Sequence, residues 1–408
     1  MTCSPPASGA PEAVLGIDLG TSAVKVLLAD AVGMATYQVR GPLPGYAETP
    51  AADWWEATRV AVRQVTAGGP SPAAVAVTGQ MHGTVLTSVD GEAVRPAIVW
   101  LDRRAGGPNP GMPGPVLRWL REHEPDAVAA ARWALQPKDW LRMRLTGSAA
   151  TDPTDASGTG LYDVDRGVWA VSSRLLPPIL PSCAVAGHLT DAAARDLGLP
   201  PGIPVATGAA DTAAALLAAD LPGPGWALLV LGTGGQWVVP DPTGSFAAAD
   251  GGRFRMGGAR NVGAALDWVR GILGVSWDEL YATAARGPVS APRFRPYLVP
   301  ESIAQTTDGA WTGLTLGHTR EDLMSAALTG VAGLLRDHLD SLRAAGASVR
   351  DVMVAGGGSR HAAWRELLST TFSLPLHPGP VTALSVRGAE RIARYALCCE
   401  DPSSHHDP

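Results

Sequence analysis

VLGIDLGTSAVKVLLA, residues 14–29, is the most informative stretch of this sequence. Two apolar runs, Val14–Asp18 and Val24–Ala29, flank the small residues Gly20-Thr21-Ser22. Apolar runs rich in β-branched residues on either side of such a turn are typical of a β-hairpin. We therefore expect the fold to begin with two antiparallel strands, followed by a third strand near Ala35–Arg40.

Helix-like and strand-like segments alternate after this hairpin. Residues 53–66 carry apolar side chains three and four positions apart, which is the spacing of an amphipathic helix. Short apolar runs at 75–78 and 98–101 predict buried strands, and residues 116–145 predict helix. The alternation predicts a mixed α/β sheet and disfavours a β-sandwich.

The opening pattern returns in the second half of the chain. A Pro/Gly cluster at 221–225 precedes the apolar run Ala227–Leu231, which leads into Gly232-Thr233-Gly234-Gly235 and the run Gln236–Val239. A strand, a Gly-Thr turn and a strand thus occur twice, which predicts two similar lobes that face a shared cleft. The expected division is a flexible leader at 1–12, an N-terminal lobe at 13–222, a C-terminal lobe at 223–397 and a tail at 398–408.

The composition excludes several classes of protein. Of the 408 residues, 46% are hydrophobic and 17% are charged, a mixture that rules out a disordered or fibrous chain. The formal net charge is −6 and no long Lys/Arg run occurs, so we expect no nucleic-acid partner. We also expect no contact with a membrane interior, because the sequence has no apolar stretch of about 18 residues.

The four cysteines are few and scattered. Cys3, Cys183, Cys398 and Cys399 form no C-x-x-C pair, so the sequence predicts neither a zinc site nor a disulfide framework. Such low cysteine usage fits a protein of the reducing cytoplasm, which is the location we expect. The sequence does not fix the oligomeric state and leaves a homodimer open.

The first strand ends in residues that suit a phosphate and a metal ion. Successive backbone N–H groups and hydroxyls in the turn Gly20-Thr21-Ser22 can bind phosphate oxygens. The carboxylate of Asp18 can hold Mg²⁺, directly or through water. An ordinary hairpin with an aspartate beside its turn would show the same pattern.

Two further glycine-rich turns follow apolar strands. Gly232-Thr233-Gly234-Gly235 repeats the position of the first turn, and Gly356-Gly357-Gly358-Ser359 lies between a strand at 352–355 and a helix at about 361–371. A helix that begins at such a turn favours an anionic ligand. Neither a Walker A loop nor a G-x-G-x-x-G fingerprint occurs, and the protein-kinase H-R-D and D-F-G motifs are missing.

Polar side chains that could serve an acceptor substrate follow other strands. Asp211 stands between a strand at 205–207 and a helix at 212–219, where it could act as a general base, although the spacing alone favours a helix N-cap. Gln80, Met81 and His82 lie between two glycines, and Asp102 follows Trp100 and precedes two arginines. A loop histidine and a surface ion pair are the simpler interpretations of these last two motifs.

These motifs together resemble the FGGY carbohydrate kinase family and, within it, the xylulokinase group. The resemblance runs from about Leu15 to about Leu376, and the segments that carry it occur in the family's order. They read LGIDLGTSAVKVLL, VTGQMHGTVL, ATDPTDASGTGLYDV, TGLTLGHTREDL and VAGGGSRHAAWRELL. The combination of GQMHG with DASGTGLYDV is the most specific part.

The resemblance implies two ribonuclease-H-like lobes of the actin and hexokinase type, with ATP in the cleft between them. It implies an ATP-dependent kinase that phosphorylates the terminal hydroxyl of D-xylulose, with Asp211 as the catalytic base and Asp18 positioning Mg²⁺. Met81 and His82 would contact the sugar, with Gln80 and Asp102 as neighbours. The residues implied to bind the nucleotide are Gly20, Thr21, Ser22, Gly232, Thr233, Gly234, Gly356, Gly357, Gly358 and Ser359.

Some positions depart from the family pattern. The family commonly has Asn after the catalytic Asp, where this chain has Thr212, and several segments are shorter than usual. These departures keep a second hypothesis open, a kinase for another ketose, a polyol or a secondary-metabolite sugar. A third hypothesis, from another class, is an actin-like scaffold that binds a nucleotide without turnover.

Overall fold

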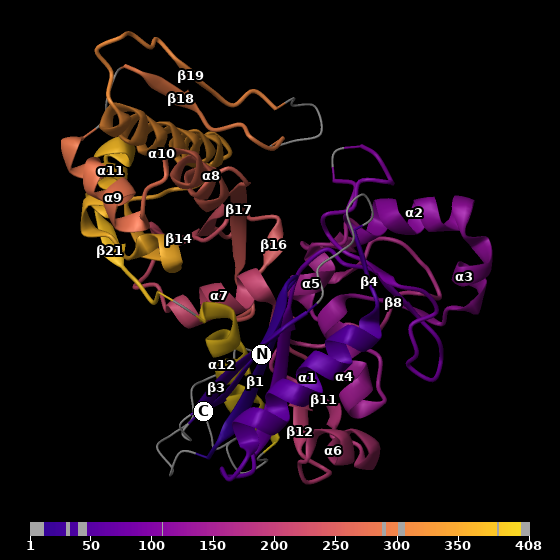
Figure 1. The fold of residues 1–408 in the computed structure, drawn as a ribbon. Helices are drawn as coiled ribbons and strands as arrows, with labels where there is room; N and C mark the ends of the chain where they lie inside the picture. Colours follow the sequence, from indigo (N-terminus) through magenta and orange to yellow (C-terminus); the bar gives the residue numbers. More distant parts are fainter. Residues whose placement is uncertain are drawn as a thin grey trace. The chain divides into compact units, whose positions relative to one another are not determined.

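The computed structural model describes residues 12–29, 33–39, 47–107, 109–287, 291–300, 307–381 and 383–400, without the side chains of the last two. Most of the expected leader and tail, and Arg40 of the expected third strand, lie outside these residues. The chain forms two compact units (Figure 1). The first contains 1–218, 245–252 and 384–408, and the second contains 219–244 and 253–383. The chain's last helix therefore belongs to the first unit, whereas the expected lobes assigned it to the second.

The main sheet of the first unit starts with the predicted hairpin. β1 (Val14–Leu19) pairs antiparallel with β2 (Ala23–Ala29), which pairs antiparallel with β3 (Gly33–Gln38). On its other side β1 pairs parallel with β5 (Ala74–Gly79), which pairs parallel with β12 (Pro204–Ala206). The strand order is β3-β2-β1-β5-β12, with β11 (Val185–His188) antiparallel at the outer edge and β13 (Ala209–Ala210) also paired with β5.

Helices cover this sheet because their apolar sides match its buried strands. α1 (Ala51–Thr66) packs against β2 and β3, and its Trp54 is fully buried. α12 (Leu384–Glu400, yellow in Figure 1) packs against β1 and β5. The contact is close: a Cβ at Gly16 of β1 would lie 2.7 Å from the carbonyl oxygen of Val386, so a larger residue would push the helix away.

The predicted helix over 116–145 is wrong as a single element. The structure has α2 (Pro113–His123), α3 (Pro125–Ala130), the strand β8 (Trp133–Leu135) and α4 (Pro137–Thr146). Proline has no N–H and disfavours helix in the residue before it, so a proline ends one helix and begins the next. The strand predicted at 98–101 is shorter than expected and consists of β7 (Ala97–Ile98).

Short elements complete the first unit. β8 pairs with β6 (Val85–Thr87), and β7 pairs with β4 (Glu48–Thr49). The others are α5 (Pro153–Ser157), β9 (Tyr162–Asp163), β10 (Val168–Trp169), α6 (Asp191–Leu197), α7 (Asp211–Ala219) and β16 (Phe246–Ala247). Cys183 is disulfide-bonded, which the cysteine spacing did not predict.

The second unit repeats the strand order of the first. β14 (Trp226–Leu231), β15 (Gly235–Pro240) and β17 (Arg253–Ala259) form an antiparallel series. β20 (Asp351–Ala355) pairs parallel with β14, and β21 (Leu376–Pro378) pairs parallel with β20. The order β17-β15-β14-β20-β21 matches β3-β2-β1-β5-β12, which confirms the repeat predicted from the two Gly-Thr turns.

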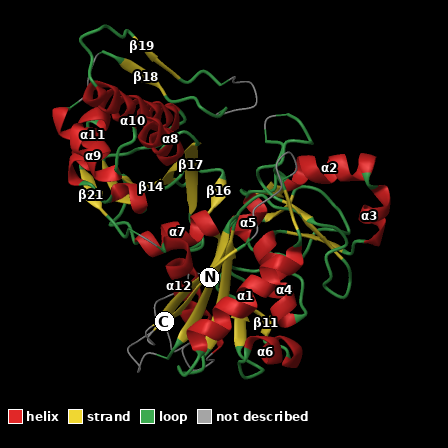
Figure 2. Ribbon diagram, viewed as in Figure 1, coloured by secondary structure: helices red, strands yellow, loops and turns green. Residues whose placement is uncertain are grey.

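Helices pack around the strands of this unit, as Figure 2 shows, and the mixed α/β class is confirmed. The long α10 (Arg320–Ala344) packs against α8 (Gly263–Leu273) and α11 (Ala362–Phe372). The remaining elements are α9 (Trp277–Ala282), the 3₁₀ turns η1 (Thr283–Arg286) and η2 (Gly357–Ser359), β18 (Arg293–Arg295) and β19 (Ala310–Thr312). None of the helices described is long and apolar enough to cross a membrane.

Candidate functional site

Two carboxylates lie at the same edge of the first unit's sheet. Asp18 is opposite Thr78 in the parallel pairing of β1 with β5. On the other side of β5, Ala210 of β13 is opposite Gly79, and Asp211 follows it as the first residue of α7. The carboxyl ends of these three parallel strands thus bring Asp18 and Asp211 to either side of β5, where α/β sheets usually bind ligands.

Asp18 is buried but has a cationic neighbour. Only 4% of its surface is exposed, and its Oδ2 lies 3.6 Å from the Nζ of Lys25, the residue opposite it in β2. Burial raises the pKa of Asp18, and the ammonium of Lys25 opposes that rise. A carboxylate held in this way retains oxygen lone pairs for a cation.

Asp211 has the acid-base properties of a general base. Burial and the nearby charge of Asp18 raise its pKa to about 7, while hydrogen bonds from Thr212 act in the opposite direction. The backbone N–H of Thr212 donates to Asp211 Oδ1 at 2.6 Å, and the Thr212 hydroxyl lies 3.2 Å from the same oxygen. The side chain is half-buried, so it keeps access to a ligand.

A glycine lets the chain reach this position. Gly208 has a φ of +84°, and a Cβ there would lie 1.9 Å from the carbonyl oxygen of Val77 in β5. Only glycine tolerates both the left-handed backbone and this contact. The close approach lets β13 pair with β5 and so directs Asp211 to the sheet edge.

Gln80 brings a buried amide without a full set of partners to the same edge. Its Oε1 accepts a hydrogen bond from the Thr21 hydroxyl at 3.1 Å, and Thr21 Oγ1 accepts one from Trp100 Nε1 at 2.9 Å. Gln80 is 3% exposed, and its Nε2 finds no hydrogen-bond partner within the described residues. A buried donor left unpaired is costly, so this amide is suited to donate to a ligand oxygen.

His82 supplies a matching acceptor. Its Nδ1 lies 2.6 Å from the carbonyl oxygen of Gly158, which can only accept, so the ring proton is on Nδ1. Burial lowers the pKa of His82, although the Gly158 hydrogen bond opposes this, and the ring is neutral at pH 7. Its Nε2 can therefore accept a hydrogen bond from a hydroxyl group.

The other two predicted sugar contacts differ in their surroundings. Met81 is buried. Its Cε and the His82 ring both pack against Gly158, so a Cβ on that residue would come close to both side chains. Asp102 is occupied by its own neighbour, because both of its oxygens accept hydrogen bonds from the Arg104 guanidinium at 2.8 and 2.9 Å. An ion pair was the simpler of the two interpretations of the Asp102 motif, the other being a contact with the acceptor substrate.

The second unit contains an open pocket of about 700 Å³ at its Gly-Thr turn. Gly232 and Thr233 line it, together with Gly357 and Gly358 of the third glycine-rich turn. Gly263 and Ala264, which begin α8, lie beside them; a Cβ at Gly263 would come within 2.2 Å of the Gly232 carbonyl oxygen. The Ala264 N–H donates to the Thr233 carbonyl oxygen at 2.8 Å, so the start of α8 packs directly against this turn.

Aromatic rings form another wall of this pocket. The Trp277 and Tyr281 rings are stacked with centroids 5.5 Å apart, and Tyr281 and His361 are stacked at 4.6 Å. Burial raises the pKa of the central Tyr281 hydroxyl to about 12. A wall of this kind can stack on a flat base.

Some of the predicted nucleotide residues have structural partners instead. The Ser359 hydroxyl donates to the carbonyl oxygen of Gly356 at 2.8 Å, and neither residue lines the pocket. Gly234 lies beside Ala259 and not in the pocket lining. In the first unit, Gly20 donates its N–H to Ala23 within the turn, and Ser22 is exposed. Their contacts with a nucleotide remain predictions.

Several residues of these sites were not predicted from the sequence. Gly263, Trp277, Tyr281 and His361 line the pocket, and Gln136 supports His82 by accepting its N–H. The Gly at the start of α8 had a local signal, since it precedes an amphipathic helix. The stack of rings had no local signal in the sequence. It joins Tyr281 of α9 to His361 at the start of α11, and these two residues are 80 positions apart.

Comparison with known proteins places the chain in a family. The N-terminal domain of the FGGY family of carbohydrate kinases matches residues 13–109 and 107–218, and the C-terminal domain matches 229–397. The xylulose kinase of Escherichia coli strain K12 is 30% identical over 406 residues, 87% of this chain and 84% of that protein. The xylulose kinase of Streptomyces rubiginosus is 31% identical over 440 residues, 96% of this chain and 89% of that protein.

A solved structure extends the likeness to three dimensions. The crystal structure of a xyloylose kinase from Brucella ovis has a TM-score of 0.85 and 30% identity, with 96% of this chain and 92% of that chain covered. This confirms the two-lobe fold class and disfavours a scaffold without turnover. The chain therefore belongs to the FGGY family of carbohydrate kinases, enzymes that transfer a phosphoryl group to a sugar hydroxyl.

Proposed function

We propose that this carbohydrate kinase phosphorylates D-xylulose to D-xylulose 5-phosphate with ATP, and that Asp211 is its general base. The observation that carries the proposal is the Asp211 carboxylate, whose pKa of about 7 suits a base at neutral pH. The Asp211 carboxylate lies at the same edge of the sheet as Gln80 and His82, which follow the end of β5. Similarity to xylulose kinases, together with the segments GQMHG and DASGTGLYDV, supports the choice of sugar.

The first unit offers complementary groups to a polyhydroxylated acceptor. Gln80 Nε2 would donate to a sugar oxygen, and His82 Nε2 would accept from a sugar hydroxyl. Asp211 would accept the proton of the attacking sugar hydroxyl. At the same time the oxygen of that hydroxyl would bond to the γ-phosphorus, and the bond between this phosphorus and the departing ADP would break. A positioned base of this kind contributes about 10²–10⁴-fold to the rate.

The carboxylate pair fits a hard divalent cation. Within the described residues no group of three or more His, Cys, Asp or Glu side chains could hold a metal alone. Mg²⁺ usually takes one or two carboxylates together with substrate phosphates and water, and Asp18, with Asp211 nearby, matches that need. When bound there, Mg²⁺ would offset negative charge on the phosphates.

The pocket of the second unit would bind ATP. Its glycine-lined turns and the start of α8 suit the phosphates, and the stack of Trp277, Tyr281 and His361 suits the adenine. Transfer requires that this nucleotide present its terminal phosphate to the acceptor held by the first unit, with ATP between the two lobes, as the family resemblance implies. Closure would exclude water as a competing acceptor.

The proposal is tested by measuring ADP release with Mg²⁺ and a panel of acceptors. The panel contains D-xylulose, other ketoses and polyols, and Asp211→Asn serves as the inactive control. We expect D-xylulose to give the highest kcat/KM. A clear preference for another acceptor would refute the choice of sugar but keep the kinase assignment.

One observation favours a second candidate, a kinase for another ketose, a polyol or a secondary-metabolite sugar. Thr212 stands where the family commonly has Asn, and its backbone N–H and hydroxyl both lie against Asp211 Oδ1. A hydroxyl is shorter than an amide, so an acceptor with a different arrangement of oxygens could fit beside it. The same panel separates the two candidates.

A further inference from the structure

The short helix α5 is hydrogen-bonded to the two segments that carry Asp211 and His82, the proposed base and sugar contact. It spans Pro153–Ser157, and Thr154, Asp155 and Ala156 are buried. One end of the helix is hydrogen-bonded to the residue before Asp211. The other end is hydrogen-bonded to His82.

The N-terminal end of α5 holds the strand that delivers Asp211. The Thr154 hydroxyl accepts the backbone N–H of Ala210 at 2.8 Å, and it donates to Asp152 Oδ2 at 2.7 Å. Thr154 is fully buried, so its hydroxyl cannot exchange these partners for water. Because Ala210 directly precedes Asp211, the position of the base depends on this hydroxyl.

The C-terminal end of α5 holds His82. The carbonyl oxygen of Gly158, which follows the helix, accepts from His82 Nδ1 at 2.6 Å. Gln136 joins the same two parts: its Oε1 accepts the His82 N–H at 3.0 Å, and its Nε2 donates to the Asp155 carbonyl oxygen at 2.5 Å. The His82 backbone has a φ of +66°, a left-handed conformation that needs such support in a residue other than glycine.

A buried ion cluster anchors the helix. Lys138 is one of only two lysines in the sequence, and its Nζ lies 2.6 Å from Asp139, 3.0 Å from Asp152 and 3.2 Å from Asp155. Burial alone would lower the pKa of Lys138, but the three carboxylates outweigh it and raise the pKa. The ammonium is therefore charged, and it ties Asp152, just before α5, and Asp155, in the middle of α5, to α4.

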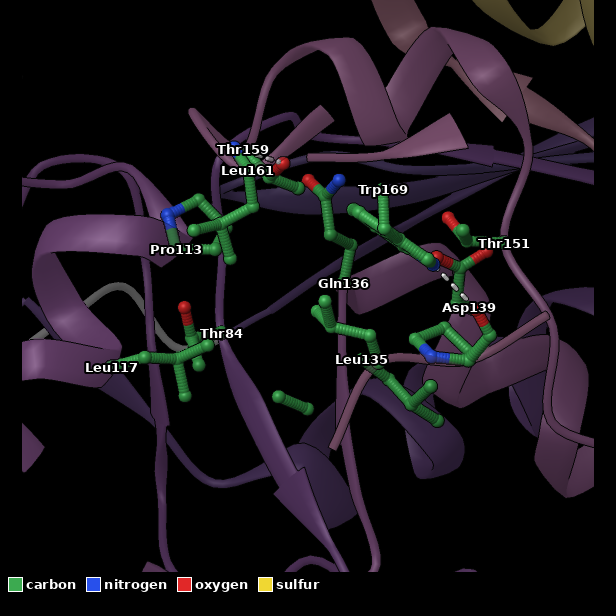
Figure 3. Close-up of a pocket in the computed structure, with 13 residues that line it drawn as sticks. Thr84, Pro113, Leu117, Leu135, Gln136, Asp139, Thr151, Thr159, Leu161 and Trp169 are labelled. Atoms are coloured by element: carbon green, nitrogen blue, oxygen red, sulfur yellow. Dashed lines mark hydrogen bonds between the residues drawn. The ribbon is translucent and has the colours of Figure 1, made fainter. Parts of the chain in front are cut away.

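The space around this network leaves little room for a change of rotamer. Figure 3 shows Gln136 near Leu135 and Asp139 in the wall of a small cavity, with Thr159 from the segment after α5 in the same wall. The cavity measures about 10 Å³, about the size of one water molecule. Gln136 itself is 4% exposed. It therefore holds its two hydrogen bonds in one geometry.

We propose that α5 fixes the base and the sugar contact relative to each other, with Thr154 as the positioning residue of Asp211 and Gln136 as that of His82. The inference rests on the proposed function of Asp211 and His82. The two ends of the helix should then affect different kinetic parameters. Misplacement of the base lowers kcat, whereas misplacement of the sugar contact raises the KM for the sugar.

The first test replaces Thr154. Thr154→Val keeps the shape but leaves the Ala210 N–H without its acceptor, and we expect kcat to fall at least tenfold while the KM for the sugar changes less than threefold. Thr154→Ser keeps the hydroxyl and should restore kcat to within threefold. Thr58→Val is the matched control, because Thr58 is also fully buried and its hydroxyl donates to a carbonyl in α1, away from the site.

The second test replaces Gln136. Gln136→Met keeps the length of the side chain but removes both hydrogen bonds, so we expect the KM for the sugar to rise at least tenfold while kcat falls less than threefold. A merely structural role would lower the melting temperature of both variants without separating KM from kcat. The separation between Thr154→Val and Gln136→Met is therefore the informative result.

A third readout needs no turnover. The exchange of the Ala210 amide hydrogen with solvent is followed by NMR of labelled enzyme. We expect it to exchange at least tenfold faster in Thr154→Val, because this amide has lost its acceptor, and at the wild-type rate in Thr58→Val. If Thr154→Val matches Thr58→Val in both kcat and exchange rate, the positioning role is overturned. If the wild type phosphorylates no acceptor, the proposed function fails, and the exchange rate alone decides the role of Thr154.

Discussion

The two units share a strand order but place very different surfaces at corresponding turns. In the first unit Gln80, which follows β5, is buried, and hydrogen bonds join it to Thr21, which follows β1, and through Thr21 to Trp100. In the second unit the turn after β14 opens into a large pocket of glycines and stacked rings. Gln80 Nε2 is a buried nitrogen without a hydrogen-bond partner, whereas none of the buried side-chain nitrogen and oxygen atoms described in the second unit lacks one.

This difference indicates which of the two units distinguishes more strictly between similar ligands. A site built from buried hydrogen-bonding groups rejects an analogue that leaves those groups unpaired, often by 10⁴–10⁵-fold. A stacking surface tolerates any base, because every base has an aromatic face. We therefore expect the first unit to recognise the acceptor atom by atom and the second to recognise the nucleotide mainly by its phosphates and shape.

The largest expected effect removes the base of the first unit. Asp211→Asn should lower kcat by about 10²–10⁴-fold, because the amide cannot accept the hydroxyl proton. Binding of a fluorescent ATP analogue should stay within twofold, because the pocket proposed for the nucleotide is in the other unit. Asp337→Asn, at an exposed position of α10, is the matched control and should keep full activity. Near-normal turnover in Asp211→Asn would refute the assignment.

The same variant should be more stable than the wild type at high pH. The pKa of Asp211 is raised in the folded state to about 7 from the ordinary value of 3.8, so the folded protein binds the proton more tightly than the unfolded chain. The free energy of unfolding of the wild type therefore falls as pH rises from about 4 to about 7. The melting temperature of Asp211→Asn should exceed that of the wild type at pH 8, and the difference should vanish at pH 4.

The aromatic wall of the second unit gives the next effect. His361→Ala removes one ring of the stack, and loss of base stacking worth about 1–3 kcal/mol should raise the KM for ATP about 5–160-fold. His361→Phe keeps a flat ring and should leave that KM within threefold. The KM for the sugar should not change in either variant. A change confined to the sugar KM would contradict the division between the units.

Lys25 tests the electrostatics of the first unit. Its ammonium lowers the pKa of both Asp18 and Asp211, so Lys25→Met should raise both. Because the base must be deprotonated, kcat of the wild type should rise with pH and level off above a midpoint near 7. In Lys25→Met this acidic limb should move to higher pH by up to about one unit, which is at most tenfold in kcat at pH 6. A shift to lower pH would contradict the role of Lys25.

Local signals were enough to predict the parts that each unit repeats. The run 14–29 predicted the hairpin, and its return at 227–239 predicted the second unit. The turn residues and Asp211 follow strands directly, and Asp18 lies near the end of β1, so a strand prediction also located them. The carboxylate of Asp102 was expected to bind a ligand, yet its ion pair with Arg104, two residues away, was visible in the sequence.

Contacts between distant residues could not be predicted in this way. The bond from Thr154 to Ala210 joins positions 56 residues apart, and the bond from Gln136 to His82 joins positions 54 apart. No periodicity marks such pairs, because each depends on how several strands and helices pack. The short α5 was missed for a different reason, because a five-residue helix makes too few turns to show a periodic pattern.

The smallest expected effect completes the comparison. With D-xylulose as acceptor, GTP should support phosphorylation with a kcat/KM within about tenfold of that for ATP, because stacking accepts either base and the described pocket residues include no buried, unpaired side-chain group to read the base edge. A sugar analogue that lacks the hydroxyl bound by His82 should instead lose at least 10²-fold. Initial rates with both nucleotides and both sugars measure the two ratios in one experiment. If GTP were rejected as strongly as the deoxy sugar, the second unit would also recognise individual atoms, and the contrast between the two surfaces would not extend to specificity.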